Sequence, residues 1–219
     1  MVSATGLAYA LVVLLSALSL LSVVQIIQTA QTLRRQRAAV STAPKTSLVL
    51  LTAATVALLL AYVFDLSVTA LLLVDGSVVP PPVGANLALV VVTLFLGQGL
   101  APSLLFASAF AIIESRVELS GLSSKDPSSI KRRKLTKWIE MFLLLALPTL
   151  MAGYLGIFTK AVLDTPIAAT EYYKWLNTGN FIYRAAYVVH ALLFRGLASH
   201  AISFHLLNKS HASVDPVSR

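Results

Sequence analysis

The sequence predicts an all-α fold: a polytopic integral membrane bundle of five transmembrane helices, with the N-terminus outside and the C-terminus cytoplasmic. Hydrophobic residues make up 57% of the chain and charged residues only 12%, about half the share typical of soluble proteins. Five long stretches carry almost no charge, and the basic residues gather between alternate stretches. Together these observations indicate a chain whose main solvent is lipid.

The apolar stretches have the length that a bilayer requires. A helix rises about 1.5 Å per residue, so a hydrocarbon core of about 30 Å takes about 20 residues. The stretches also lack the alternation of barrel strands. The whole chain, 1–219, is therefore expected to form one transmembrane domain. Its predicted spans cover approximately residues 7–27, 46–74, 86–113, 138–158 and 179–207.

The 17 Lys and Arg residues predict the orientation, because cytoplasmic loops of membrane proteins carry an excess of basic residues. Only Lys160 and Lys174 fall in the opposite loops, and Arg184 and Arg195 lie inside the fifth span. The other 13 occupy three segments on the predicted inner side: Arg34, Arg35, Arg37, Lys45, Arg116, Lys125, Lys131, Arg132, Arg133, Lys134, Lys137, Lys209 and Arg219.

The first two spans differ in what surrounds them. The first has no basic residue before it and several after it, the reverse of a secretory signal peptide, so we expect a retained helix and keep cleavage as the alternative. The second is longer than one crossing needs and contains Asp65, so it either tilts strongly or ends near that residue. The connector 75–84 contains three consecutive prolines and no basic residue, which places it outside.

Small residues and prolines in the third and fourth spans predict close packing and kinks. Helices in lipid approach one another where side chains are small, and a proline removes a helical hydrogen bond. The residues concerned are Gly97, Gly99, Ala101 and Pro102 in the third span and Pro148, Gly153 and Gly156 in the fourth.

The loop 114–137 holds seven basic residues and is expected in the cytoplasm. Ser128 or Ser129 can cap a short surface helix through IKRRKLTKW. The cluster there either merely keeps the loop inside, which we favour, or also attracts anionic lipid headgroups at about 1 kcal/mol per residue. Lipid, not nucleic acid, is the expected partner of its four residues, Lys131, Arg132, Arg133 and Lys134.

Ionisable residues inside a span are costly and therefore candidates for function. Asp65 and Arg184 lie at matching depths near the outer side, so we expect them either to pair or to reach water separately. Arg195 lies about 22 Å inward from the start of its span, counted at the helical rise, and no acidic residue is expected at that depth.

All four histidines lie in the last thirty residues, which raises the question of a haem or metal site. His190 and His200 are about 80° apart around the helix and about 15 Å apart along it, so they cannot ligate one centre. No other helix contains histidine, and the chain has no cysteine. We therefore predict no metal and no cofactor, and we expect the histidines to hydrogen-bond between helices or to face lipid headgroups.

Three functions stay open, and the lack of catalytic motifs argues against an enzyme. The favoured one is a non-enzymatic, receptor-like or small-ligand-binding bundle, with a pocket among spans two, three and five. A transporter or channel component would instead use a polar pathway through span five, and an accessory subunit or haem-binding oxidoreductase would use its histidines. The sequence leaves open other subunits, a second copy, and a plasma or internal membrane. The candidate residues are Asp65, Gln98, Arg184, His190, Arg195 and His200.

Overall fold

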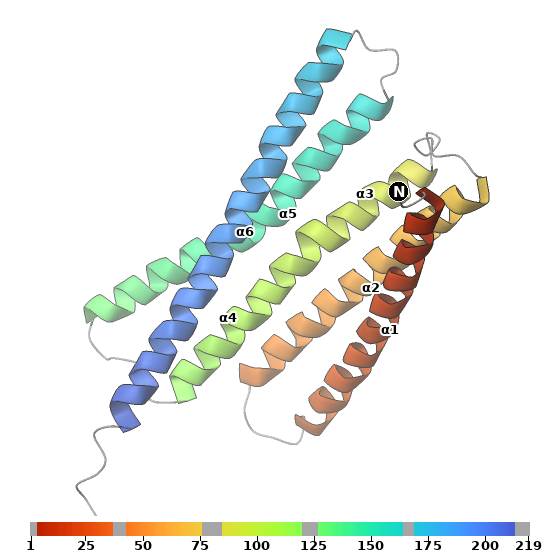
Figure 1. The fold of residues 1–219 in the computed structure, drawn as a ribbon. Helices are drawn as coiled ribbons and strands as arrows, with labels where there is room; N and C mark the ends of the chain where they lie inside the picture. Colours follow the sequence, from red (N-terminus) through yellow and green to blue (C-terminus); the bar gives the residue numbers. More distant parts are fainter. Residues whose placement is uncertain (1–3, 37–42, 76–84, 120–126, 164–168, 213–219) are drawn as a thin grey trace, which may run out of the picture.

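The computed structural model describes residues 4–36, 43–75, 85–119, 127–163 and 169–212, all of them helical (Figure 1). Five continuous rods result, each long and apolar enough to cross a membrane. The predicted all-α fold with five candidate spans is thus confirmed. The elements are α1 (Ala4–Gln36), α2 (Ala43–Asp75), α3 (Ala85–Leu94), the π-helical segment η1 (Phe95–Leu100), α4 (Ala101–Leu119), α5 (Pro127–Leu163) and α6 (Ala169–Ala212).

The rods form two pairs joined by a central one. α1 packs on α2, and α5 packs on α6. The rod made of α3, η1 and α4 lies between the pairs and contacts both α2 and α5 (Figure 1). Within the described ranges, α1 contacts only α2, and α6 contacts α5 and α4 but not α2. The neighbour order of the helices therefore largely follows the chain.

The apolar segments of the structure overlap every predicted span, with two differences. α2 does not end near Asp65 but runs to Asp75 as one helix. The predicted surface helix is not separate either, because residues 130–138 belong to α5, whose first residue, Pro127, suits a helix start. Most of the proline-rich connector, 76–84, lies outside the described residues. The segments are Ala8–Arg35, Lys45–Ala70, Leu87–Ser115, Lys134–Leu163 and Tyr173–Ile202.

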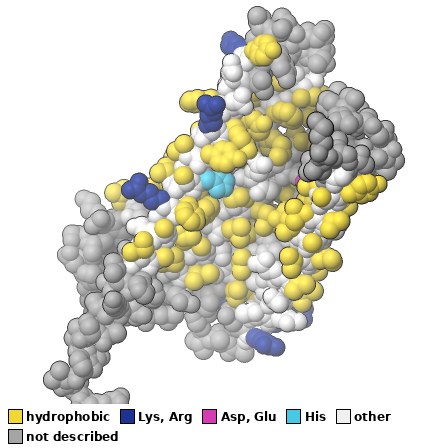
Figure 2. All heavy atoms as spheres, in the orientation of Figure 1, with side chains coloured by type: hydrophobic (Ala, Val, Ile, Leu, Met, Phe, Trp, Pro, Cys, Tyr) yellow, Lys and Arg dark blue, Asp and Glu magenta, His cyan; other side chains and the backbone are white. Residues whose placement is uncertain are grey.

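A compact core lies where α4, α5 and α6 meet. Its buried residues are Leu147, Met151, Ala186 and Leu193, with Phe106 and Phe110 of α4 packed against them. Hydrophobic side chains are spread over the described part of the face shown in Figure 2, and many large ones are exposed. Phe142 and Phe181 are 71% and 75% exposed, a surface typical of proteins that meet lipid or partners rather than water.

Close packing of the central rod depends on its small residues. A Cβ atom added to Gly99 would lie 3.1 Å from Cβ of Met151, and one on Gly97 would lie 3.5 Å from Cβ of Ala61. Ala101 is completely buried. The packing role predicted for these three residues is confirmed. It is wrong for Gly153 and Gly156, where an added Cβ would meet no described residue within 4 Å.

The π-helical segment η1 precedes Pro102, the second residue of α4. The backbone N–H of Ala101 donates to the carbonyl of Leu96, five residues earlier. In a regular α-helix Pro102 would leave the carbonyl of Gln98 without its partner and its ring would press on that group. A wider turn relieves this crowding, and such turns are frequent at functional sites.

Candidate functional site

A half-open cavity of about 310 Å³ lies between α1, α2, α3 and η1. This volume is at the lower end of the range for small-molecule sites. Four polar side chains line it, Tyr62, Asp65, Thr93 and Gln98, and most of the remaining wall is apolar. A mostly apolar wall with a few polar groups is the usual composition of a ligand site. The other lining residues are Leu15, Leu58, Ala61, Val68, Val90, Leu94 and Gly97.

Helical spacing explains why these residues share one cavity. On α2 the lining residues begin at Leu58 and recur at intervals of three or four, through Asp65 to Val68. On the central rod the same spacing runs from Val90 through Thr93 to Gly97. Residues three and four apart lie on one face of a helix. The cavity is thus bounded by one stripe of α2 and one stripe of the central rod, with Leu15 of α1 completing it.

Two polar groups in the cavity have no partner among the described residues. The carboxylate of Asp65 forms no ion pair or hydrogen bond there; the hydroxyl of Thr69 donates to the backbone carbonyl of Asp65, not to its carboxylate. The Oγ1 atom of Thr93 is buried and lacks a hydrogen-bond partner within the described chain. The Asp65 side chain is half-buried and the Thr93 oxygen is buried, and polar groups that lose water without gaining a partner are costly, so both can gain from a ligand.

The predicted ion pair between Asp65 and Arg184 is not formed. Within the described ranges α6 does not contact α2, and Arg184 is exposed on α6. Matching depth along the helices did not predict this pairing correctly. Depth gives the position of a residue along the helix axis, but it does not tell which other helix lies next to it.

Gln98 links the cavity to α6. Its side-chain oxygen accepts a hydrogen bond from the hydroxyl of Tyr183, at 3.3 Å. That hydroxyl also lies 2.9 Å from the hydroxyl of Tyr187, and the ring centroids of Tyr183 and Tyr154 are 5.1 Å apart. Sequence reasoning missed these tyrosines, although the four-residue spacing of Tyr183 and Tyr187 places both on one face of α6.

The other predicted site residues of α6 lie away from the cavity lining. His190 is half-buried against Phe106, with ring centroids 6.0 Å apart. Arg195 is exposed, and no described residue forms an ion pair with it. The structure therefore brings Asp65 and Gln98 together and leaves Arg184, His190, Arg195 and His200 elsewhere.

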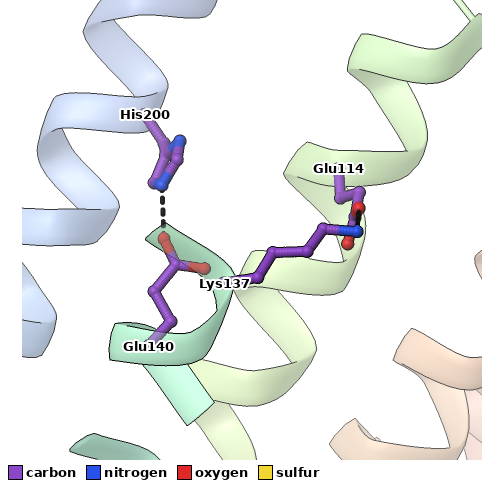
Figure 3. A network of polar contacts seen from close by, with 4 residues as sticks. All are labelled: Glu114, Lys137, Glu140 and His200. Atoms are coloured by element: carbon purple, nitrogen blue, oxygen red, sulfur yellow. Dashed lines mark hydrogen bonds and ion pairs between the residues drawn. The ribbon is translucent and has the colours of Figure 1, made fainter. Parts of the chain in front are cut away.

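A second polar cluster lies at the opposite end of the bundle (Figure 3). His200 of α6 hydrogen-bonds through Nε2 to Glu140 of α5, at 2.5 Å. Lys137 of α5 forms an ion pair with Glu114 of α4. The expectation that histidines bond between helices is confirmed for His200. Glu140 was missed as its partner, although it stands inside the predicted fourth span.

The basic residues 131–134 lie near the start of α5, and the Lys134 side chain is exposed. In the described part of the chain no group of three or more His, Asp or Glu residues could hold a metal ion.

Comparison of this chain with protein-family models, with curated proteins and with solved structures found no match.

Proposed function

We propose that the chain is a multi-pass membrane protein that binds a small ligand in the cavity beside Asp65, as a non-enzymatic, receptor-like bundle. The observation that carries the proposal is the cavity itself, where Asp65 and Thr93 present polar groups that have no partner among the described residues, between apolar walls. Polar groups that converge in an apolar cavity fix the orientation of a ligand.

The position of the cavity supports access from outside. Leu15, Asp65 and Val90 stand in the first half of α1, the second half of α2 and the first half of the central rod, so the cavity lies toward the end of the bundle that holds the N-terminus. The basic residues gather at the opposite end of the helices. By the positive-inside rule that opposite end is cytoplasmic, and the cavity then faces the external side.

The arrangement favours ligand binding over a transport pathway. A pathway through span five would need its polar residues to face a shared space at several depths. Arg195 is instead exposed, and His190 packs on an aromatic ring. The core where α4, α5 and α6 meet includes the buried apolar side chains of Leu147 and Leu193.

The absence of cysteine makes a direct test straightforward, because a single introduced thiol is the only one in the chain. Thr93→Cys places a thiol in the cavity, and Thr149→Cys places one on the exposed surface of α5. In sealed vesicles, a membrane-impermeant thiol reagent is expected to modify Thr93→Cys from the N-terminal side and to leave Thr149→Cys unmodified. Failure to modify Thr93→Cys from that side would overturn the proposal.

A further inference from the structure

Asp65 is a carboxylate whose charge the described residues do not compensate. Arg184, the basic residue expected at its depth, is on a helix that does not contact α2. No described side chain forms an ion pair with Asp65, yet the residue lines a cavity inside an apolar segment. A carboxylate in such surroundings is stabilised by an opposite charge close by.

The neighbours of Asp65 in the cavity suit a cation that also donates hydrogen bonds. Tyr62 stands three residues before Asp65 on the same face of α2 and offers an aromatic ring. Thr93 offers an oxygen without a partner among the described residues, and Gln98 offers a side-chain amide. An ammonium group carries three donors and one positive charge, which matches a carboxylate with nearby oxygens.

The hydrocarbon side chains in the rest of the wall make a bare metal ion a poor ligand for this cavity. Hard cations prefer several oxygen ligands at once, whereas Leu15, Leu58 and Val90 line this cavity with hydrocarbon. A volume of about 310 Å³ also leaves room for an organic body beside the charged group.

We infer that the cavity binds a compact organic cation, whose ammonium group faces Asp65 and whose apolar body lies against the hydrocarbon wall. The inference rests on the proposed ligand-binding function and adds the chemical class of the ligand. The ammonium can belong to a free amine or to the headgroup of a lipid, since the same chemistry recognises both.

The test compares two probes of almost equal shape, 2-phenylethylammonium and uncharged 2-phenylethanol. The full chain is placed in nanodiscs of phosphatidylglycerol, which contains no ammonium group, and binding is measured by calorimetry. The wild type is expected to bind the amine at least about tenfold more tightly than the alcohol, as a charge-assisted hydrogen bond implies. Asp65→Asn should remove that preference, and the alcohol binding that remains shows that the variant is folded.

Two further variants separate this inference from the proposed function. Val90→Phe fills the cavity, whereas Val92→Phe makes the same change at an exposed position outside the lining. Suppose that the wild type binds both probes with equal affinity, and that this binding is lost in Val90→Phe and kept in Val92→Phe. That result would overturn the inference that the ligand is a cation and would support the proposed ligand cavity. Amine binding that survives Asp65→Asn would likewise overturn the inference, as would binding of neither probe.

Phosphatidylethanolamine added to the nanodiscs distinguishes the two sources. A lower apparent affinity for the amine in the wild type, absent in Asp65→Asn, identifies a lipid headgroup as occupant. An unchanged affinity identifies a free amine. Either result keeps the ammonium group as the recognised chemistry.

Discussion

Gly99 shows how the absence of a side chain lets two helical rods approach each other. An added Cβ would lie 3.1 Å from Cβ of Met151 and 3.5 Å from Cα of Pro148. Gly99→Ala is therefore expected to lower the free energy of unfolding by about 1–3 kcal/mol, as overpacking does. The measurement is unfolding of the purified protein in mixed micelles, followed by circular dichroism.

Gly153→Ala is the matched control for Gly99→Ala, because a Cβ there meets no described residue within 4 Å. Its stability should equal or slightly exceed that of the wild type, since alanine favours helix over glycine. Equal losses in the two variants would contradict the close contact of η1 with α5.

The bond between His200 and Glu140 predicts a measurable coupling between α5 and α6. The side chain of His200 is 39% exposed and that of Glu140 17%, so solvent weakens the interaction. A double-mutant cycle with Glu140→Gln and His200→Gln is expected to give a coupling of about 0.5–1 kcal/mol. The same cycle with Glu140→Gln and Arg195→Gln should give no coupling. A coupling in that cycle, and none with His200→Gln, would show that Glu140 pairs with Arg195 and would contradict the bond to His200.

At the scale of the element, η1 forms part of the wall of the cavity and owes its width to the proline that follows it. Pro102→Ala supplies the missing N–H and removes the ring, which favours a regular α-helix through 95–102. Gly97 and Gln98 would then turn relative to α2, and we expect slower thiol modification of Thr93→Cys in this background. Modification is followed by mass spectrometry at timed intervals.

Pro148→Ala is the control for the element, because Pro148 lies inside α5, does not line the cavity, and approaches Gly99 of η1 through its Cα atom, which alanine keeps. This change should leave the rate at Thr93→Cys unaltered. If both proline variants slowed modification equally, a general loosening of the bundle would explain the result better than η1.

At the scale of the whole molecule, the charge pattern predicts the orientation. A glycosylation reporter in the connector 75–84 is expected to be modified, and one at Lys125 is not, because only the external side meets the glycosylating enzyme. Gel mobility before and after enzymatic deglycosylation measures the outcome. Modification at Lys125 alone would reverse the orientation and place the cavity on the cytoplasmic side.

The spans were predictable because length and hydropathy belong to each segment alone. Asp65 was identified for the same reason, as a charge in an apolar run. Thr93 and Tyr62 were not identified, because their role depends on which helix faces are turned toward each other. In an apolar segment, one sequence does not distinguish the face that packs on a neighbouring helix from the face that does not. The Asp65–Arg184 pair failed on this point, since the central rod separates α2 from α6.

The hydrogen bond from Tyr183 to Gln98 has a thermodynamic consequence. A ligand that engages the side-chain oxygen of Gln98 competes with a bond that holds α6 to the central rod. Ligand binding would then weaken the contact between α6 and the central rod. By thermodynamic linkage, a partner whose affinity for the protein changes when the ligand binds would change the affinity for the ligand by the same factor. One amide would in this way couple the ligand cavity to a helix whose described side chains do not line it.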